Sequence, residues 1–347
     1  MVGPALPSKP STTPKTVLET GSTLLYPLMG SWTQAYQKEF QNPSTKAPYA
    51  TIDTGATGSG TGIADAASGT VDIGASDAYL SSSVKSTTPT LINIALAVSA
   101  QQINYNVPGQ KNLKLDATVL AGMYNGKITN WNDPAIKALN PGVNLPSMKV
   151  VPLHREDSSG DTFLFTSYLS TGDQSAADQQ WNSQIGYGTT VTWPSVPGEL
   201  VETGSVTVLH ACASTPGCVA YNGISYLAQA EAGGLGEAEL ANHAGQYTLP
   251  TAEAITASVD SFVSLTPPNE TISMIDGPAL TGYPIVNYEY AVVSTRQPDA
   301  AKAGALTAFL KWIITTGNQP HYVDTVGFQP LPGALVALGK QQIAEIG

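Results

Sequence analysis

The chain has 347 residues, with 26 acidic and 15 basic side chains and a formal net charge of −11 at pH 7. This length exceeds the size at which one hydrophobic core keeps growing, so we expect two lobes. With 42% hydrophobic and 12% charged residues, the composition is that of a packed globular protein and excludes a disordered one. The acidic balance argues against nucleic-acid binding, which needs a basic face, but not against a small anion, because charges beyond about 8 Å are largely screened.

The start of the chain differs in composition from the rest. Residues 1–15 are rich in Pro, Ser and Thr and lack periodicity, which predicts a disordered tether. No secretory signal is visible, and an initiator Met beside such a stretch is consistent with removal of a native leader. No apolar run reaches about 18 residues, so no membrane-spanning segment is expected.

Beyond residue 15 the hydrophobic pattern alternates between the periods of strands and helices. In chain order it predicts a helix over 28–40, a strand over 49–54, a small-residue helix around 63–67, a strand over 71–75, helices over 117–125 and 134–139, a strand over 149–153, a helix over 161–169, a strand over 219–224, and helices over 252–264, 299–315, near Tyr322 and over 334–346. Such alternation is typical of α/β lobes with largely parallel sheets.

Two β-rich segments, 92–107 and 284–294, are long for a single strand. We expect both to cross between the lobes and to serve as a hinge, near 101–106 and 285–290. Two crossings leave a discontinuous first lobe and put a ligand cleft between the lobes. The predicted boundaries are 16–104 with 287–347 for lobe I, and 105–286 for lobe II.

Cys212 and Cys218 flank ASTPG, a turn-forming insert. Their spacing across a Pro-Gly turn predicts a disulfide that closes a small loop, the alternative being two reduced cysteines on that loop. A disulfide would indicate an oxidising compartment. The four histidines lack the spacing of metal ligands, so we predict no metal site; they are His154, His210, His243 and His321.

Three loops place glycines and small hydroxyl residues after a strand or before a helix: 21–24, 58–60 and 158–161. Such loops free backbone N–H groups and hydroxyls to converge on an oxyanion, and helix N-termini favour negative charge. Each loop taken alone is more often a plain turn.

Arg155 stands just before the third loop, in HREDSSGDTF. Its planar guanidinium can make two parallel contacts to an oxyanion. The alternatives are a surface ion pair with Glu156 or Asp157, or both roles together, with Asp157 orienting the guanidinium while its other face meets a ligand.

Asp77 follows a predicted strand in DIGASDA. Taken alone, this carboxylate is more simply a helix N-cap. Beside an anion site it would accept the proton of a protonated oxyanion and repel an anion that has no proton to give.

Motifs for catalysis and nucleotide binding do not match. GATGSGTG lacks the Lys-Ser/Thr ending of a P-loop, and its evenly spaced glycines do not fit G-x-G-x-x-G. Ser59 has Thr57 where a nucleophile elbow needs Gly. We therefore expect a binding protein with no catalytic step.

Taken together and in their order along the chain, the three loops, Asp77 and Arg155 resemble the phosphate-binding receptors of phosphate-specific ABC importers, the PstS family. They are most similar to the actinobacterial lipoprotein branch of that family. The resemblance extends from Glu19 to about Leu331. It is carried by the stretches TGSTLLYP, GATGSGTGIADA, DIGASDAYLS, GKITNWNDPAIKALNPG, PLHREDSSGDTFLFTSYL and YPIVNYEYAVV.

The resemblance implies an α/β fold of the two-lobed periplasmic-binding-protein type (type II), with a hinge and a dehydrated phosphate between the lobes. The residues that it assigns to phosphate binding are Ser22, Thr23, Leu24, Ser59, Asp77, Arg155, Asp157, Ser159, Gly160 and Asp161, with Asp157 holding the arginine in place. Better-known members carry Thr at position 161, so the Asp161 side chain either accepts from a protonated phosphate or turns away. Leu24 replaces an aromatic residue, which matters little for a backbone contact.

The resemblance also implies partners and a location. The partners are the membrane permease and ATPase subunits of a phosphate importer, and no cofactor is implied. The branch is held at the outer face of the plasma membrane by an acylated N-terminal Cys, and no such Cys precedes Val2 here.

Three other functions compete with phosphate binding. A phosphate-handling hydrolase could use the same donors, but it would need a metal or a nucleophile. A receptor for sulfate, molybdate or tungstate would have the charge of Asp77 facing a fully ionised anion. A cell-wall or adhesion protein without a small ligand would leave the convergent loops and Arg155 unexplained.

Overall fold

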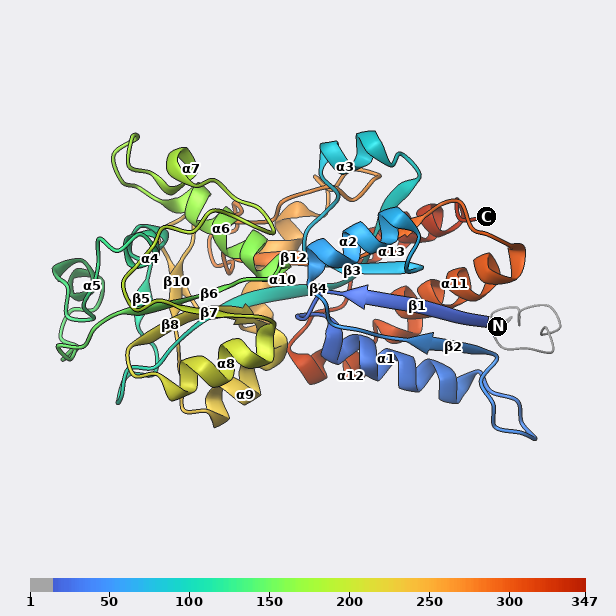
Figure 1. Cartoon of the computed structure of the whole chain (residues 1–347), viewed down its shortest axis with the longest axis horizontal. Helices are drawn as coiled ribbons and strands as arrows, with labels where there is room; N and C mark the ends of the chain where they lie inside the picture. The colour runs from blue at the N-terminus through green and yellow to red at the C-terminus, as the bar shows by residue number, and fades with distance from the viewer. Residues whose placement is uncertain (1–14) are drawn as a thin grey trace.

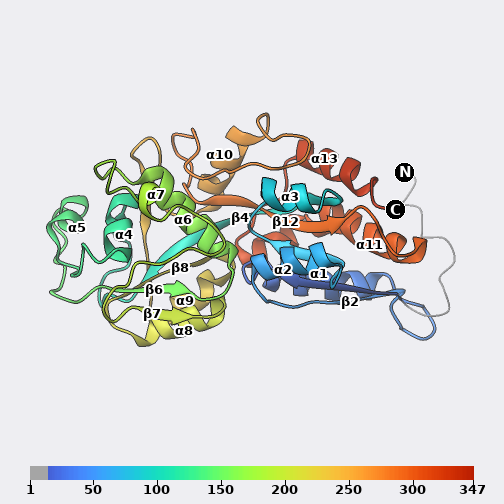
Figure 2. The ribbon, with the colours of Figure 1, turned by 45° about the horizontal axis from the view of Figure 1, so that its top comes forward.

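A computed structural model describes residues 15–347 as two lobes that lie side by side along the long axis (Figures 1 and 2). The tether predicted for 1–15 lies outside the described residues except for Lys15, which begins the first strand. That strand begins, and the chain ends, in the same lobe (Figure 1). No helix among residues 15–347 is long and apolar enough to cross a membrane.

A nine-stranded sheet runs through both lobes in the order β2-β1-β3-β12-β4-β8-β6-β7, with β9 also paired to β4. Its strands are β1 (Lys15–Gly21), β2 (Ala50–Asp53), β3 (Ile73–Ser76), β4 (Leu91–Tyr105), β6 (Val151–Arg155), β7 (Leu200–Glu202), β8 (Cys218–Gly223), β9 (Gly236–Glu237) and β12 (Val286–Ser294). A second sheet holds β5 (Lys114–Leu115), β10 (Glu239–Ala241) and β11 (Tyr247–Thr248).

The long segment predicted to cross between the lobes is one strand, β4, which is 15 residues long and almost wholly buried. It pairs with β12 from Leu91 to Ala100 and with β8 from Gln101 to Tyr105. The sheet therefore passes from one lobe to the other at the change of partner. This change supports the proposed lobe boundaries, which stay a prediction, as does the hinge.

The expectation of largely parallel sheets is only partly right. The outer strands of each lobe are parallel, β1 with β2 and β3, and β6 with β7 and β8. The central strand β4 is antiparallel to β12, β8 and β9, and β12 is antiparallel to β3. Because β4 crosses between the lobes and its neighbours β12 and β8 run in the opposite direction, the middle of the sheet is mixed.

The helices cover both faces of the sheet. They are α1 (Tyr26–Glu39), α2 (Ser59–Ser68), α3 (Ser82–Thr87), α4 (Ala117–Tyr124), α5 (Pro134–Leu139), α6 (Gly160–Gly172), α7 (Trp181–Gln184), α8 (Ser205–Ser214), α9 (Leu227–Ala232), α10 (Ala252–Phe262), α11 (Ala300–Trp312), α12 (Pro320–Val323) and α13 (Gly333–Ile343). The predicted helices are present within a few residues, whereas the predictions omitted α3, α7, α8 and α9. Of these, α3, α7 and α9 have at most six residues, so their apolar spacing spans too few turns to stand out.

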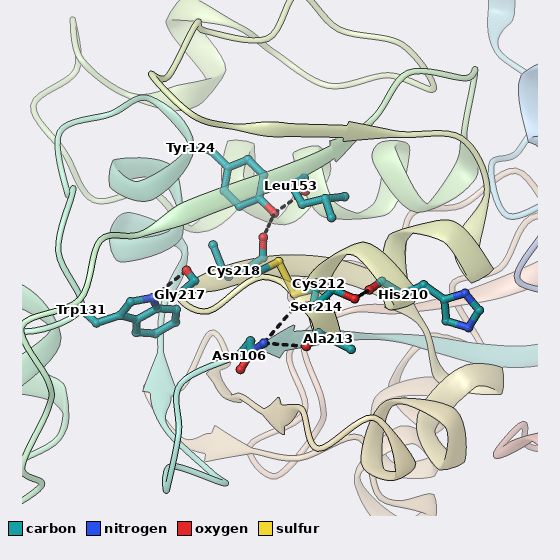
Figure 3. Close-up of a disulfide and its surroundings, with 11 residues drawn as sticks. Asn106, Tyr124, Trp131, Leu153, His210, Cys212, Ala213, Ser214, Gly217 and Cys218 are labelled. Carbon is teal, nitrogen blue, oxygen red and sulfur yellow. Dashed lines mark hydrogen bonds between the residues drawn. A yellow bond between two sulfur atoms is a disulfide. The ribbon is translucent and has the colours of Figure 1, made fainter.

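The predicted disulfide between Cys212 and Cys218 is confirmed, and Figure 3 shows its surroundings. Cys212 lies in the last turns of α8 and Cys218 begins β8, with 5.3 Å between their Cα atoms. The Asn106 side-chain amide donates to the carbonyls of Cys212 and Ala213, at 3.1 and 2.9 Å. The disulfide and these bonds fix the end of α8, and hence the direction in which its other end points.

Candidate functional site

The candidate residues converge where the two lobes face each other. They follow the carboxyl ends of the parallel strands β1, β3 and β6, the edge at which ligands bind in open α/β sheets. Both views show α2 and α6 meeting at this junction (Figures 1 and 2). The structure brings together all ten residues assigned by the resemblance.

On the first lobe, hydrogen bonds hold the loop after β1 against β3 and Asp77. The backbone N–H of Ser22 donates to the Ala75 carbonyl at 2.9 Å, which ties the loop to β3. The Ser22 hydroxyl donates to the Asp77 carboxyl and accepts from the Leu25 N–H. Ser22 therefore orients Asp77, and both side chains are buried.

Thr23 and Leu24 are held from the opposite lobe. The Tyr226 hydroxyl donates to the Thr23 carbonyl at 2.8 Å, and the Ser225 hydroxyl donates to the Leu24 carbonyl at 2.7 Å. The Leu24 side chain is buried against Gly223. These bonds occupy the carbonyl groups of both residues and hold the loop in place. The Thr23 hydroxyl lies near the centre of the site.

Arg155 is 3% exposed, so the surface ion-pair interpretation is wrong. Its Nε donates to Asp157 Oδ1 at 2.6 Å, and Nη2 is paired with Asp157 Oδ2. Nη1 faces the centre, where it donates to Thr23 Oγ1 at 3.2 Å and to Asp161 Oδ2 at 3.1 Å. Asp157 thus orients one edge of the guanidinium, as in the combined interpretation, while Nη1 at the other edge faces Thr23 and Asp161. Contact of that edge with a ligand stays a prediction.

Two helix N-termini point at the same space. Gly58 precedes α2 with φ of 94°, which a residue with a side chain rarely adopts, and Ser59 begins the helix fully buried. The Ser159 hydroxyl caps α6 by accepting from the Thr162 N–H at 3.4 Å. The dipoles of both helices favour an anion near these N-termini.

Gly160 lies where the two lobes are in close contact. A Cβ at this position would overlap Asp77 Oδ2 and Ser59 Oγ. Nearby, the Gly60 N–H donates to the Ser158 carbonyl at 2.9 Å, so the lobes are in contact here. Glycine at 160 is thus required by space, in addition to offering its N–H.

The site is rich in carboxyl groups. Burial, and then the charge of Glu289, raises the pKa of Asp77 well above its usual value. Burial and the charge of Asp77 raise the pKa of Asp161 to about 7, against the lowering effect of Arg155. Burial disfavours a charged Arg155, but Asp157 and Asp161 outweigh it and raise its pKa. One guanidinium thus lies beside several acids, and the raised pKa values favour protonated carboxyl groups in the site.

The Asp161 side chain does not turn away from the site, whereas its acceptance of a proton from phosphate stays a prediction. Its Oδ2 pairs with Arg155 and accepts from Ser205 at 3.2 Å, while Oδ1 accepts from Gln101 Nε2 at 3.1 Å. The carboxyl therefore lies within the site and is held by three donors. Its backbone N–H belongs to the first turn of α6.

Sequence reasoning missed two neighbours of these residues. Ser205 begins α8 and shares a 2.7 Å hydrogen bond with Thr23 Oγ1, and Arg155 Nη1 donates to it at 3.4 Å. The run Thr203-Gly204-Ser205 repeats the glycine–hydroxyl pattern of the other loops and could have been found. Gln101, on β4, donates to the Asp161 carbonyl at 2.8 Å. Nothing in its local sequence marks it.

This arrangement can hold a small oxyanion with one guanidinium, several hydroxyls and N–H groups, and at least one acceptor for a proton on the anion. Among residues 15–347 no three His, Cys, Asp or Glu side chains are grouped as metal ligands. His154 lies outside the site, where its ring stacks on Trp193 at 4.7 Å between centroids.

Comparisons with known proteins point in one direction. The model of the PBP superfamily domain matches residues 7–316. The phosphate-binding protein PstS of Methanocaldococcus jannaschii is 33% identical over 98% of this chain and 88% of its own. Phosphate-binding protein PstS 3 of Mycobacterium leprae is 32% identical over 91% of this chain and 83% of its own.

Solved structures share the fold. The phosphate-binding protein from Stenotrophomonas maltophilia has a TM-score of 0.69 at 18% identity and covers 94% of this chain and 93% of its own. The high-affinity periplasmic phosphate-binding protein PfluDING, bound with phosphate, has a TM-score of 0.69 at 20% identity, covering 95% and 93%.

Proposed function

The chain belongs to the PstS family of phosphate-binding proteins, within the PBP superfamily, and from that premise we propose that it binds inorganic phosphate between its lobes. It delivers the anion to the permease and ATPase subunits of a membrane ABC importer. The observation that carries the proposal is the buried guanidinium of Arg155, oriented by Asp157 and facing Thr23 from the opposite lobe.

The contacts follow from the donors that face the centre of the site. Arg155 supplies the charge-assisted bonds, and Thr23 and Ser59 supply hydroxyls. The remaining donors are backbone N–H groups, at Thr23, Leu24, Gly160 and Asp161, together with the hydroxyl of Ser159. Asp157 and Ser22 act indirectly, by positioning Arg155 and Asp77. Ser205 joins the set, because its hydroxyl touches Thr23 and Arg155.

Asp77 selects phosphate over other tetrahedral oxyanions. Inorganic phosphate has three ionisable protons and loses the second at a pKa of about 6–7, by analogy with phosphoesters, so near neutral pH it still carries a P–OH group that can donate to a buried carboxylate. Sulfate carries none, and like charges juxtaposed in a poorly screened cleft cost several kcal/mol. The same reasoning disfavours molybdate and tungstate.

The proposal includes no catalytic step, which fits a family of solute-binding proteins. The hydroxyls of Ser22 and Thr23 bond to a carboxyl group and to another hydroxyl, and no histidine is among the partners of either. A hydrolase would need such a base or a metal to activate a nucleophile.

Delivery to an importer places the receptor outside the cytoplasm, in the cell envelope. The disulfide between Cys212 and Cys218 fits an oxidising compartment. Attachment to the outer face of the plasma membrane through a lipid anchor is the final part of the proposal.

Calorimetric titration of the purified, phosphate-free protein tests this function. Phosphate should bind with a stoichiometry of one, and sulfate, molybdate and tungstate should give no comparable heat at the same concentrations. Absence of phosphate binding, or equal binding of sulfate, would contradict the proposal.

A further inference from the structure

A second acid lies directly behind Asp77. Glu289, on β12, is 0% exposed, and its carboxyl group lies within hydrogen-bonding reach of that of Asp77. Nothing in its local sequence marked it as part of the site, because it stands in an ordinary β-rich run, PIVNYEYAVV.

The surroundings of Glu289 fix its orientation. Its Oε1 accepts from Ser99 Oγ at 2.5 Å and from Asn287 Nδ2 at 3.0 Å. Its Oε2 is buried and has no donor among the described residues. The same Asn287 amide donates to the backbone carbonyl of Asp77 at 3.4 Å, so one side chain contacts both acidic residues. A proton held between the two carboxyl groups would satisfy Oε2.

Two carboxylates in contact and out of water cannot both stay ionised, and such pairs lose their protons in coupled steps. Each member here has one oxygen within reach of a hydroxyl donor, Ser22 for Asp77 and Ser99 for Glu289, although Ser99 also lies 2.7 Å from Asn287 Oδ1. The proton can therefore be held by either acid.

Other charged and titratable groups also bear on the pair. Asp161, on α6, adds negative charge near both acids, whereas Arg155, on β6, favours an ionised Asp77. The Tyr290 phenol, on β12, feels the charge of Glu289 and stays neutral because burial and neighbouring charges raise its pKa. Burial raises the pKa of both acids of the pair.

We propose that Asp77 and Glu289 hold one proton between them and that this pair controls the pH range over which phosphate binds. The inference rests on the proposed function. While the pair keeps its proton, it carries a single negative charge and offers an acceptor to the P–OH group. When the pair loses the proton at alkaline pH, two buried charges face a dianion, and affinity falls.

Substitution Glu289→Gln tests this. The amide keeps the shape, donates to Asp77 and carries no charge. Above about pH 8 phosphate stays in one ionic form, its second pKa being about 6–7 by analogy with phosphoesters. A further change in affinity between pH 8 and 10 therefore reports the protein. We expect the wild type to lose at least tenfold in affinity over this range and E289Q to lose less than threefold. Parallel pH profiles would overturn the proposal.

Glu270→Gln is the matched control, since Glu270 is also a buried glutamate but contacts the Ala95 N–H of β4 and lies outside the site. It should keep the wild-type pH profile of binding. Ser99→Ala is a second variant, available if E289Q does not fold. It removes a donor that favours ionised Glu289, so the alkaline loss of affinity should move to higher pH. An unmoved profile would count against the pair.

Infrared spectroscopy separates failure of this inference from failure of the function. At pH 7.5 the difference between wild type and E289Q should show the loss of one protonated-carboxyl band, whether or not phosphate binds. An unchanged band would mean that no proton depends on Glu289, which overturns the proposal. Absence of phosphate binding by the wild type would instead overturn the function.

Discussion

The site is formed by loops 21–24, 58–60 and 158–161, together with Asp77 and residues 155–157. Arg155 is the only basic residue among them. Its buried position removes it from water, and Asp157 then provides the geometry that a free arginine would lack. The remaining donors are neutral, so most of the electrostatic attraction for a dianion comes from this one side chain.

Replacement of Arg155 by Ala should therefore weaken phosphate binding by at least tenfold, because bonds to charged groups contribute about 1.5–3 kcal/mol each. Lys should restore binding only in part, since it lacks the planar fork. Calorimetry on both variants measures this, with thermal unfolding as the check on folding. Unchanged affinity in the Ala variant would remove Arg155 from the site.

Asp77→Asn isolates the basis of selectivity. The amide keeps the shape and can still accept from P–OH, so phosphate binding should remain substantial, while the like-charge penalty on sulfate is lifted. The ratio of phosphate to sulfate affinity should fall tenfold or more. A variant that rejects sulfate as strongly as the parent would show that Asp77 is not the discriminating group and would direct attention to Asp161.

The residues found from sequence alone were those marked by a local pattern. Each of these patterns can be recognised within a few positions of the sequence: a glycine–hydroxyl loop, an arginine after a strand, or an acid in a small-residue run. Gln101 and Glu289 do not, because they enter the site only through the pairing of β4 with β8 and of β4 with β12. Such contacts depend on tertiary structure that no local spacing encodes.

At the scale of elements, the site depends on how closely α6 approaches β3 and α2. Gly160 allows that approach, since any side chain there would overlap Asp77 and Ser59. The helix N-terminus can then deliver its N–H groups directly to a ligand.

Gly160→Ala should weaken phosphate binding roughly 5- to 150-fold, the equivalent of about 1–3 kcal/mol of overpacking in the closed form. Calorimetry measures the effect. Gly304→Ala is the matched control: this exposed glycine in α11 has nothing within 4 Å of its added Cβ, so binding should not change. Normal affinity in the Gly160→Ala protein would show that the lobes need not come this close.

The elements predicted correctly were those with strong local signals. Pro134 opens α5 behind an Asp133 cap, and the apolar spacing of α1 spans several turns. The direction of the central strands was missed because parallel and antiparallel pairing leave similar β-rich runs when both faces are buried. The α8 helix was missed because the cysteine turn dominated the interpretation of that region.

At the scale of the whole molecule, the described arrangement joins the lobes by direct contacts across the site. Tyr226 bonds to Thr23, and Tyr79 packs edge-on against Phe163 at 5.4 Å between centroids. Both contacts link segments on opposite sides of the junction, so binding and packing of the lobes share the same residues.

Buried acids also determine how stability depends on pH. Burial raises the pKa of Glu270 to about 8 and that of Glu19 to about 8. Because these values exceed those of the unfolded chain, their contribution to stability is fully present below about pH 4.5 and is lost as the pH rises through about 8. Each group changes the free energy of unfolding by at most about 1.4 kcal/mol per pH unit.

Glu270→Gln should therefore flatten the decline in stability between pH 5 and pH 8. Urea unfolding at several pH values, compared with the wild type, measures the slope. Identical slopes in the two proteins would mean that Glu270 is already ionised in the folded state.

A crystal structure of the protein with phosphate tests the central claim most directly. We predict one phosphate between the lobes, in contact with the Arg155 guanidinium, the Thr23 hydroxyl and the N-terminus of α6, with a P–OH group facing Asp77. A phosphate bound elsewhere, or a cleft that stays without the anion at saturating concentration, would contradict the account.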